Sequence, residues 1–316
     1  MIRLGSRRSP LALVQAHAVA GALRAAGHDV EIVEVVTTGD RDRAAPDKAK
    51  WVTELERGLV EGTIDLAVHS AKDVPGDIPD SLALVAATER EDPRDVLIGA
   101  RSLEDLPEGA RVGTASLRRA AQLLATRPDL DVVEIRGNVD TRLGRLSSAV
   151  PAHADPVDAI VLAAAGLHRL GREPEGVSPL IGPAFVSAPG QGTLALEARA
   201  DDPAIAEAVR AVHHEDSWVA LLAERAVSGA LGADCTSAVG AHCRRIGDGL
   251  TLEGFVGAPD GSGWVVDIQE GSEPEALGAL VAERLRRAGA DELLDAARAE
   301  SDIPPGPEPH REDRPE

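Results

Sequence analysis

RVGTASLRRAAQLLATRPDLDVVEIRGNVDTRLGR, residues 111–145, is the stretch that decides the fold. It predicts a short strand ending near 113, a helix over 117–126 and a second strand near 131–135, because apolar runs and turn residues alternate at those spacings. The stretch carries seven Arg against four acidic residues, although the whole chain has a formal net charge of -20. It therefore indicates both an α/β fold and a cationic site.

Two arginines, Arg118 and Arg119, fall in the first turn of that helix, and Ser116 is its predicted N-cap. Cations are unfavourable at this end, because the helix dipole already makes the N-terminus positive. An anion held there by backbone amides and guanidinium groups would account for them. The alternative is a solvated arginine pair that is tolerated at a small energetic cost.

The same alternation of strands and helices runs from residue 2 to 199 and predicts an α/β fold with two parallel, doubly wound lobes. The segment 193–199 alternates apolar and other residues and is predicted to be a strand that crosses back into the first lobe. Gly190 and Gly192 flank Gln191 just before it. The expected strands are 2–4, 30–36, 64–70, 81–88, 95–99, 110–113, 131–135 and 158–163, and the expected helices are 10–26, 51–62, 117–126, 140–148 and 165–170.

The residues after about 203 predict a smaller third unit of the α+β type. Two alternating runs, 250–256 and 263–269, are expected to form a hairpin because Pro-Asp-Gly lies between them. Helices are expected at 204–214, 218–231 and 272–289, and the Pro-rich, charged tail 301–316 is expected to be disordered. The expected domains are 1–90 with 193–212, then 94–188, then 213–300, followed by the tail 301–316.

The composition indicates a soluble, cytoplasmic protein. The chain has no run of about 18 apolar residues such as a membrane span requires, and its N-terminus lacks the apolar stretch of a secretory signal. With 53 acidic against 33 basic residues, a generic nucleic-acid partner is disfavoured. A dense acidic shell stays hydrated in concentrated salt, so we also expect a salt-adapted, halophilic cytoplasm.

The two cysteines, Cys235 and Cys243, are too few for a disulfide scaffold. With His242 they make three candidate ligands and no second cluster, so no metal is expected. Cys235 follows the 218–231 helix on a Gly- and Ala-rich loop. It is either a small core residue or a nucleophile, and a cationic cleft facing this loop would favour the nucleophile by stabilising the thiolate.

Polar and charged side chains recur directly after the predicted strands, where open α/β sheets bind ligands. Because arginine binds two oxygens of a carboxylate or phosphate at once, six arginines at one edge predict a polyanionic ligand in a cleft. Asp73, a carboxylate among cations, suits the stabilisation of a cationic intermediate or the movement of a proton. Each residue alone has an alternative as a solvated loop or helix-end group. The set is Arg7, Ser9, Lys72, Asp73, Thr114, Ser116, Arg118, Arg119, Arg136, Asn138, Arg142 and Arg169.

Seven segments of the chain, in order, resemble the porphobilinogen deaminase family, whose members are also called hydroxymethylbilane synthases. The resemblance runs from Arg3 to about residue 295. The segments are HSAKDVP (69–75), REDPRD (90–95), VGTASLRR (112–119), EIRGNVDTRLGRL (134–146), AAGLHRLG (164–171), APGQGTLALEAR (188–199) and ERAVSGALGADC (224–235).

The resemblance implies a monomeric enzyme with two lobes like those of type II periplasmic binding proteins and a third domain that carries a cofactor. Such enzymes join four porphobilinogen molecules head to tail onto a covalent dipyrromethane primer. They release ammonia at each step and hydrolyse off hydroxymethylbilane, in tetrapyrrole and haem biosynthesis. Cys235 occupies the position of the cysteine that holds the dipyrromethane. Since each porphobilinogen carries an acetate and a propionate, the growing oligopyrrole is the polyanion that the arginines predict.

Individual roles are also implied by the resemblance. Asp73 matches the catalytic aspartate, which stabilises pyrrole N–H groups, assists proton transfer and contacts the cofactor. The positions that hold the cofactor's carboxylates are matched by Ser70, Lys72, Thr114, Ser116, Arg118 and Arg119. The positions that hold substrate and the elongating chain are matched by Arg7, Ser9, Arg136, Arg142, Arg169 and Gln191.

One loop departs from the family pattern. It is shortened to GDRDRAAPDKAKW (39–51), in which Lys48 and Trp51 keep one lysine and the aromatic residue of the usual loop. The alternative to an enzyme is a non-catalytic, anion-binding module on the same fold, because fold does not decide function. Cys235 and Asp73 favour the enzyme, since a simple binder needs neither.

Overall fold

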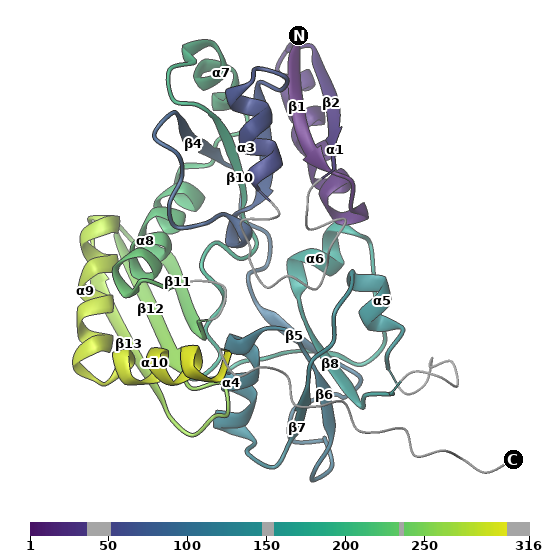
Figure 1. The fold of residues 1–316 in the computed structure, drawn as a ribbon, viewed down its shortest axis with the longest axis vertical. Coiled ribbons are helices and arrows are strands. Elements are labelled where there is room, and N and C mark those ends of the chain that lie inside the picture. The colour runs from purple at the N-terminus through teal and green to yellow at the C-terminus, as the bar shows by residue number, and fades with distance from the viewer. Residues whose placement is uncertain (37–51, 147–154, 234–236, 302–316) are drawn as a thin grey trace, which may run out of the picture.

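The computed structural model describes residues 1–36, 52–146, 155–233 and 237–301, and it shows two lobes with a third unit beside them (Figure 1). Within the stretch 111–145 the predicted order of strand, helix and strand is present. β6 (Arg111–Gly113) and β7 (Asp131–Val133) pair in parallel, and α4 (Leu117–Thr126) connects them with the predicted boundaries. Ser116 caps α4, as expected, by accepting a hydrogen bond from the amide of Arg119 at 3.4 Å.

The first sheet has five strands in the order β2-β1-β3-β10-β4. β1 is parallel to β2 and β3, whereas β10 is antiparallel to β3 and β4. The strand predicted at 193–199 is present as β10, and with it the chain returns to the first lobe after building the second. The elements are β1 (Ile2–Arg7), α1 (Pro10–Ala25), β2 (Val30–Val35), α3 (Thr53–Val60), β3 (Leu66–Ser70), the 3-10 turn η2 (Ala71–Asp73), β4 (Leu82–Ala87) and β10 (Leu194–Arg199).

The second sheet has the order β7-β6-β8-β5-β9. β6 is parallel to β7 and β8, and β5 is antiparallel to β8 and β9. The short edge strand β9 was not predicted. Besides β6, α4 and β7, this lobe contains β5 (Asp95–Ile98), α5 (Val139–Leu143), β8 (Ala159–Ala163), α6 (Ala164–Arg169) and β9 (Val177–Pro179).

The prediction of wholly parallel sheets was wrong for β5 and β10. Each of these strands follows a segment that crosses between the lobes, 88–94 before β5 and 187–193 before β10. Both crossings reach the edge at which the parallel strands end. A strand that enters a sheet from that edge must run against its parallel neighbours, so each sheet is mixed.

The first sheet is covered on both faces, as a doubly wound lobe requires. α1 packs Val19 against Leu4 of β1 on one face, and α3 packs Leu55 against Ala67 of β3 on the other. The carboxyl ends of β1 and β3 are therefore held rigidly, and the residues that follow them carry the site.

A three-stranded antiparallel sheet, β11-β12-β13, forms the third unit. α8 and α9 cover one face, and Phe255 on the other face packs against Ala121 of α4. The predicted hairpin and the predicted helix before it are present, but β11 and α10 were not predicted; β11 ends in exposed charged residues that hide its alternation. The elements are α7 (Pro203–Ala208), η3 (Val209–Ala211), α8 (Glu215–Leu231), β11 (Val239–Ile246), β12 (Gly249–Gly257), β13 (Trp264–Gly271), α9 (Pro274–Arg287) and α10 (Ala290–Ser301).

A buried carboxylate, Glu224 of α8, joins the third unit to both crossing segments. Arg90 donates to it at 2.6 Å, the amide of Gly190 at 2.6 Å and the amide of Cys243 at 2.7 Å. Burial opposes the charge, but Arg90 outweighs it, and the pKa of Glu224 lies below its ordinary value. One carboxylate thus ties together the first crossing, the second crossing and β11.

Candidate functional site

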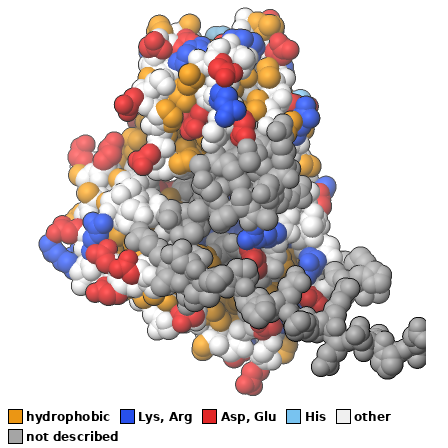
Figure 2. All heavy atoms as spheres, viewed as in Figure 1, with side chains coloured by type: hydrophobic (Ala, Val, Ile, Leu, Met, Phe, Trp, Pro, Cys, Tyr) orange, Lys and Arg blue, Asp and Glu red, His pale blue; other side chains and the backbone are white. Residues whose placement is uncertain are grey.

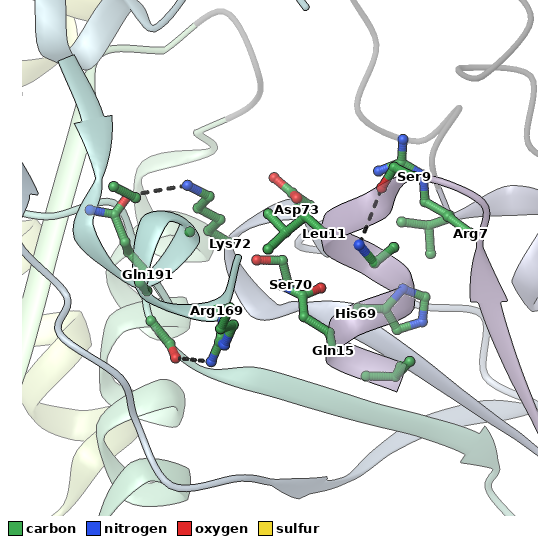
Figure 3. A pocket seen from close by; sticks show the side chains of 17 residues that line it. Arg7, Ser9, Leu11, Gln15, His69, Ser70, Lys72, Asp73, Arg169 and Gln191 are labelled. Carbon is green, nitrogen blue, oxygen red and sulfur yellow. Dashed lines mark hydrogen bonds between the residues drawn. The ribbon is translucent and has the colours of Figure 1, made fainter. Parts of the chain in front are cut away.

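A cavity of about 100 Å³ lies where the carboxyl ends of strands from both lobes meet, and we call it the interlobe cavity. Asp73 and Ser70 lie near its centre, with Lys72 and Gln191 on one side and Ser9 on the other (Figure 3). Its lining includes seven of the predicted site residues: Arg7, Ser9, Ser70, Lys72, Asp73, Arg169 and Gln191.

Asp73 reaches this cavity because β3 ends at Ser70 and the chain turns at once through η2. Ala71, in the middle of that turn, is buried and approaches Gly190 so closely that a Cβ at position 190 would lie 2.9 Å from its own Cβ. The close contact between Ala71 and Gly190 therefore holds the turn in place. The carboxylate of Asp73 makes no hydrogen bond within the described part of the chain, so it is available to a ligand.

Lys72 extends from the same turn toward the second crossing segment, where its Nζ donates to Oε1 of Gln191 at 3.3 Å. Burial, followed by the nearby charge of Arg119, lowers the pKa of Lys72 to about 8. Lys72 is mainly protonated at neutral pH, and the cavity loses this positive charge as the pH rises above about 8.

The arginine pair, Arg118 and Arg119, is buried and does not face solvent. Both side chains contact the carboxylate of Asp95, Arg118 at 2.7 Å and Arg119 at 2.8 Å. The prediction of an external anion at this helix end was incomplete, because an internal carboxylate already meets both guanidinium groups. Burial opposes the charge of Asp95, but the arginine pair outweighs it and holds the pKa of Asp95 well below its usual range.

The arginine pair nevertheless keeps donors for a ligand. In Arg118, Nη1 donates to Oε1 of Gln122 at 2.9 Å and to the carbonyl of Val186 at 2.8 Å, and the same nitrogen contacts Asp95. Its Nε and Nη2 form no hydrogen bond within the described residues. At the same helix terminus Thr114 is buried, and its hydroxyl accepts from the amide of Ser116 at 3.2 Å.

The remaining predicted arginines differ in where they lie. Arg169 lines the interlobe cavity and donates to the carbonyl of Gly192 at 2.6 Å. Arg142 donates to the carbonyl of Gly137 at 2.9 Å and is not among the described residues that line the cavity; burial, followed by the charge of Arg119, lowers its pKa. Arg136 is exposed and paired with Glu134 at 2.6 Å, and it is not among the described residues that line the cavity.

Three predicted residues, Cys235, Lys48 and Trp51, lie outside the described residues. The other cysteine, Cys243, is buried between α8 and the sheet, where desolvation raises the pKa of its thiol to about 12. Among the described residues, no group of three or more His, Cys, Asp or Glu side chains is arranged to hold a metal. No helix in the described ranges is long and apolar enough to cross a membrane.

Sequence reasoning missed one residue of the site, Asp95. Asp95 is the first residue of β5, whose residues are all buried. A charged residue in a buried strand needs a partner, and this was the sign that the sequence offered. The arginine pair is that partner, but the spacing along the chain gave no reason to join residues 95 and 118. The contact depends on β5 and α4 meeting in the second lobe.

The comparisons with known proteins identify a family. The family model described as "Porphobilinogen deaminase, dipyromethane cofactor binding domain" matches residues 2–207, and "Porphobilinogen deaminase, C-terminal domain" matches residues 218–287. The porphobilinogen deaminase of Geobacter metallireducens is 44% identical over 305 residues, covering 93% of each chain. That of Rubrobacter xylanophilus is 44% identical over 303 residues, covering 93% of this chain and 97% of its own.

Among solved structures, a nutrient binding protein from Burkholderia cenocepacia bound to methionine is 18% identical, with a TM-score of 0.42, and covers 67% of this chain and 91% of its own. The fold and site define a two-lobed protein that places a carboxylate among cations between its lobes. The chain belongs to the porphobilinogen deaminase family.

Proposed function

We propose that the interlobe cavity is the active site of a hydroxymethylbilane synthase, which joins four porphobilinogens, releases ammonia and hydrolyses off the linear product in tetrapyrrole and haem biosynthesis. The observation that carries the proposal is the position of Asp73, a carboxylate that makes no hydrogen bond among the described residues, in a cavity whose cations come from both lobes. Cations bind the acetate and propionate groups, and the carboxylate stabilises positive charge on a pyrrole.

Asp73 is assigned the catalytic role. Its oxygens can accept hydrogen bonds from pyrrole N–H groups as positive charge develops, and can hold or return a proton. Ser70, the last residue of β3, and Lys72, next to Asp73 on η2, line the same cavity, so an acidic side group of the substrate that meets Lys72 brings the pyrrole ring toward Asp73. The turn is fixed by β3 and Gly190, which keeps this geometry before the substrate arrives.

The residues present fit the dipyrromethane cofactor of the family. Its carboxylates need donors that are not fully used within the protein, and Nε and Nη2 of Arg118 are such donors within the described part of the chain. When bound, this group supplies the pyrrole carbon that serves as primer. We assign its carboxylates to Ser70, Lys72, Thr114, Ser116 and the arginine pair, with Asp73 facing its N–H groups.

Of the two cysteines, Cys235 is the one we assign to the covalent thioether. Thioether formation needs a thiolate, or a thiol that can lose its proton, and it needs access to the ligand. Cys243 has neither, because it is 2% exposed and its pKa is raised to about 12. Cys235 lies between the end of α8 at Leu231 and the start of β11 at Val239.

Substrate and the growing chain are assigned to Arg7, Ser9 and Arg169, which line the cavity, and, on the family resemblance, to Arg142. Arg136 is kept in this group on the family resemblance, at the outer edge of the site. We propose the domain division 1–90 with 193–212, 94–188 and 213–300, because each group of residues contains its own sheet. We further propose a cytoplasmic monomer with porphobilinogen and the oligopyrrole as its ligands.

Intact mass of the purified protein tests the proposed function. Protein from cells that make porphobilinogen is expected to be heavier than its sequence by two linked pyrrole units. The added mass should remain after denaturation, since a thioether is covalent. An unmodified mass from such cells would instead favour a non-catalytic anion binder.

Replacement of Arg118 by Leu is expected to prevent cofactor loading. The change removes donors for a carboxylate and leaves Asp95 with one guanidinium partner in place of two, in a buried place where charges need partners. Loading is measured by intact mass after expression with porphobilinogen present. Arg111→Leu is the matched control, because Arg111 pairs with Asp131 at the surface of the same lobe; full loading of Arg118→Leu would show that the arginine pair does not hold the cofactor.

The surface charge supports the proposal of a salt-adapted protein. Acidic side chains are spread over the visible face (Figure 2), and acids exceed bases by 53 to 33 in the whole chain. We expect the melting temperature to rise as KCl is raised from low to molar concentration, because the screening length falls to about 3 Å at 1 M and the acids no longer repel one another. A melting temperature that stays level or falls over that range would contradict salt adaptation.

A further inference from the structure

Gln191, which the resemblance places among the substrate-binding residues, is 0% exposed and sits at the junction of the two lobes. Its amide nitrogen donates to the carbonyl of Pro93 at 2.7 Å and to Oδ1 of Asp95 at 2.9 Å. Its amide oxygen accepts from Lys72 at 3.3 Å. Both N–H donors of this side chain are therefore used inside the protein.

The orientation of this amide is set by its neighbours. Two acceptors face its nitrogen and an ammonium faces its oxygen, and the reversed amide would set donors against donors. The backbone is fixed too: Gly190 and Gly192 have positive φ values of 73° and 92°. A Cβ at Gly192 would lie 2.3 Å from the carbonyl oxygen of Glu91. The Gly-Gln-Gly sequence of the second crossing segment thus presents one amide to the first crossing segment.

Asp95 is the residue on which these contacts converge. It meets Arg118 at 2.7 Å, Arg119 at 2.8 Å and the amide of Gln191 at 2.9 Å. Through Gln191 it is also linked to Lys72, the residue next to Asp73. Three cations assigned to the cofactor's carboxylates are consequently arranged around one internal carboxylate.

We propose that Asp95 and Gln191 are positioning residues: Asp95 is the resident counter-ion that holds the arginine pair in place before an anionic ligand binds, and Gln191 links this counter-ion to Lys72. The inference rests on the function proposed above and moves Gln191 from substrate contact to internal support. A buried cluster of cations without a counter-ion would repel itself and spread. With Asp95 present, the cations stay close enough to receive one ligand together.

The link between Gln191 and Asp95 is tested by exchanging the hydrogen-bond donor and acceptor of this pair. Full-length apoprotein, made in cells that do not form porphobilinogen, is incubated with porphobilinogen, and the rate of mass gain is followed. Gln191→Glu sets two carboxylates against each other, and Asp95→Asn removes the counter-ion. Each single variant is expected to load about 10-fold more slowly or worse, the equivalent of one hydrogen bond to a charged group.

The double variant, Gln191→Glu with Asp95→Asn, again places an amide donor opposite a carboxylate and keeps one negative charge. It is expected to load faster than Gln191→Glu alone, a rescue that a role in packing would not produce. The proposal is overturned if the double variant is as slow as the two single effects multiplied, or if the single variants load at the wild-type rate.

Two further measurements distinguish a folding defect from a loss of cofactor loading. Gln191→Met has a similar volume without the amide, so it keeps the packing; it is expected to melt cooperatively and still load slowly, and normal loading would overturn the proposal. Wild-type protein is loaded in parallel. A wild-type chain that gains no mass refutes the proposed function, whereas a wild-type chain that loads beside variants that load equally well refutes only the positioning role.

Discussion

Asp73→Asn is expected to lower kcat by about 10²–10⁴-fold, the range usual for a group that transfers a proton or stabilises charge in the transition state. The amide keeps the shape of the side chain but loses the negative charge that pyrrole N–H groups would meet. Turnover is measured as product formation from porphobilinogen. Cofactor mass is recorded on the same sample, so that a loss of rate is not confused with a loss of loading.

The fold should tolerate this change, because the carboxylate of Asp73 has no hydrogen-bond partner within the described residues. The melting temperature is therefore expected to stay close to that of the wild type. Asp77→Asn is the matched control: it removes the same charge from an exposed position on the same loop and should leave turnover nearly unchanged. Near-normal turnover of Asp73→Asn would remove Asp73 from the catalytic role.

Cys235→Ala is expected to abolish the covalent mass increase and, with it, essentially all turnover. The thioether needs the sulfur of this residue, and a primer held by charge contacts with Lys72 and the arginine pair would be lost with the product. Intact mass shows the attachment directly, and product formation shows its consequence. The expected mass is that of the unmodified sequence.

Cys243→Ala is the control for this experiment. Cys243 is buried between α8 and the sheet, so its replacement removes a buried sulfur and is expected to lower stability by about 1 kcal/mol while loading remains complete. A Cys235→Ala protein that still carries two linked pyrrole units would show that the attachment lies elsewhere.

Much of the fold was predictable because its elements are defined locally. α4 begins and ends where the sequence predicted, since Ser116 is its N-cap and the apolar spacing fits a helix. The hairpin of β12 and β13 followed from its turn residues. The directions of β5 and β10 were not predictable, because a strand's direction depends on the edge from which the chain enters the sheet.

The candidate site was predictable to the extent that it lies directly after strands. Lys72 and Asp73 follow β3, Arg7 is the last residue of β1 and Ser9 follows it, so that the meeting of strand ends brought them to one cavity. Arg136 also follows a strand, yet it pairs with Glu134 and is not among the described residues that line the cavity, because the position after a strand does not fix the direction of a long side chain.

What the sequence by itself determined is the set of chemical groups: a carboxylate among arginines, a cysteine after a helix, and the ordered segments that identify the family. These follow from residue types and local periodicity. What only the tertiary structure decided is which groups meet. Asp95 neutralises the arginine pair, and Gln191 turns its amide toward Lys72 and Asp95, because β5, α4 and the second crossing segment pack together. The distance between two charged groups is set by how the elements that carry them pack, and the spacing of the residues along the chain does not specify it.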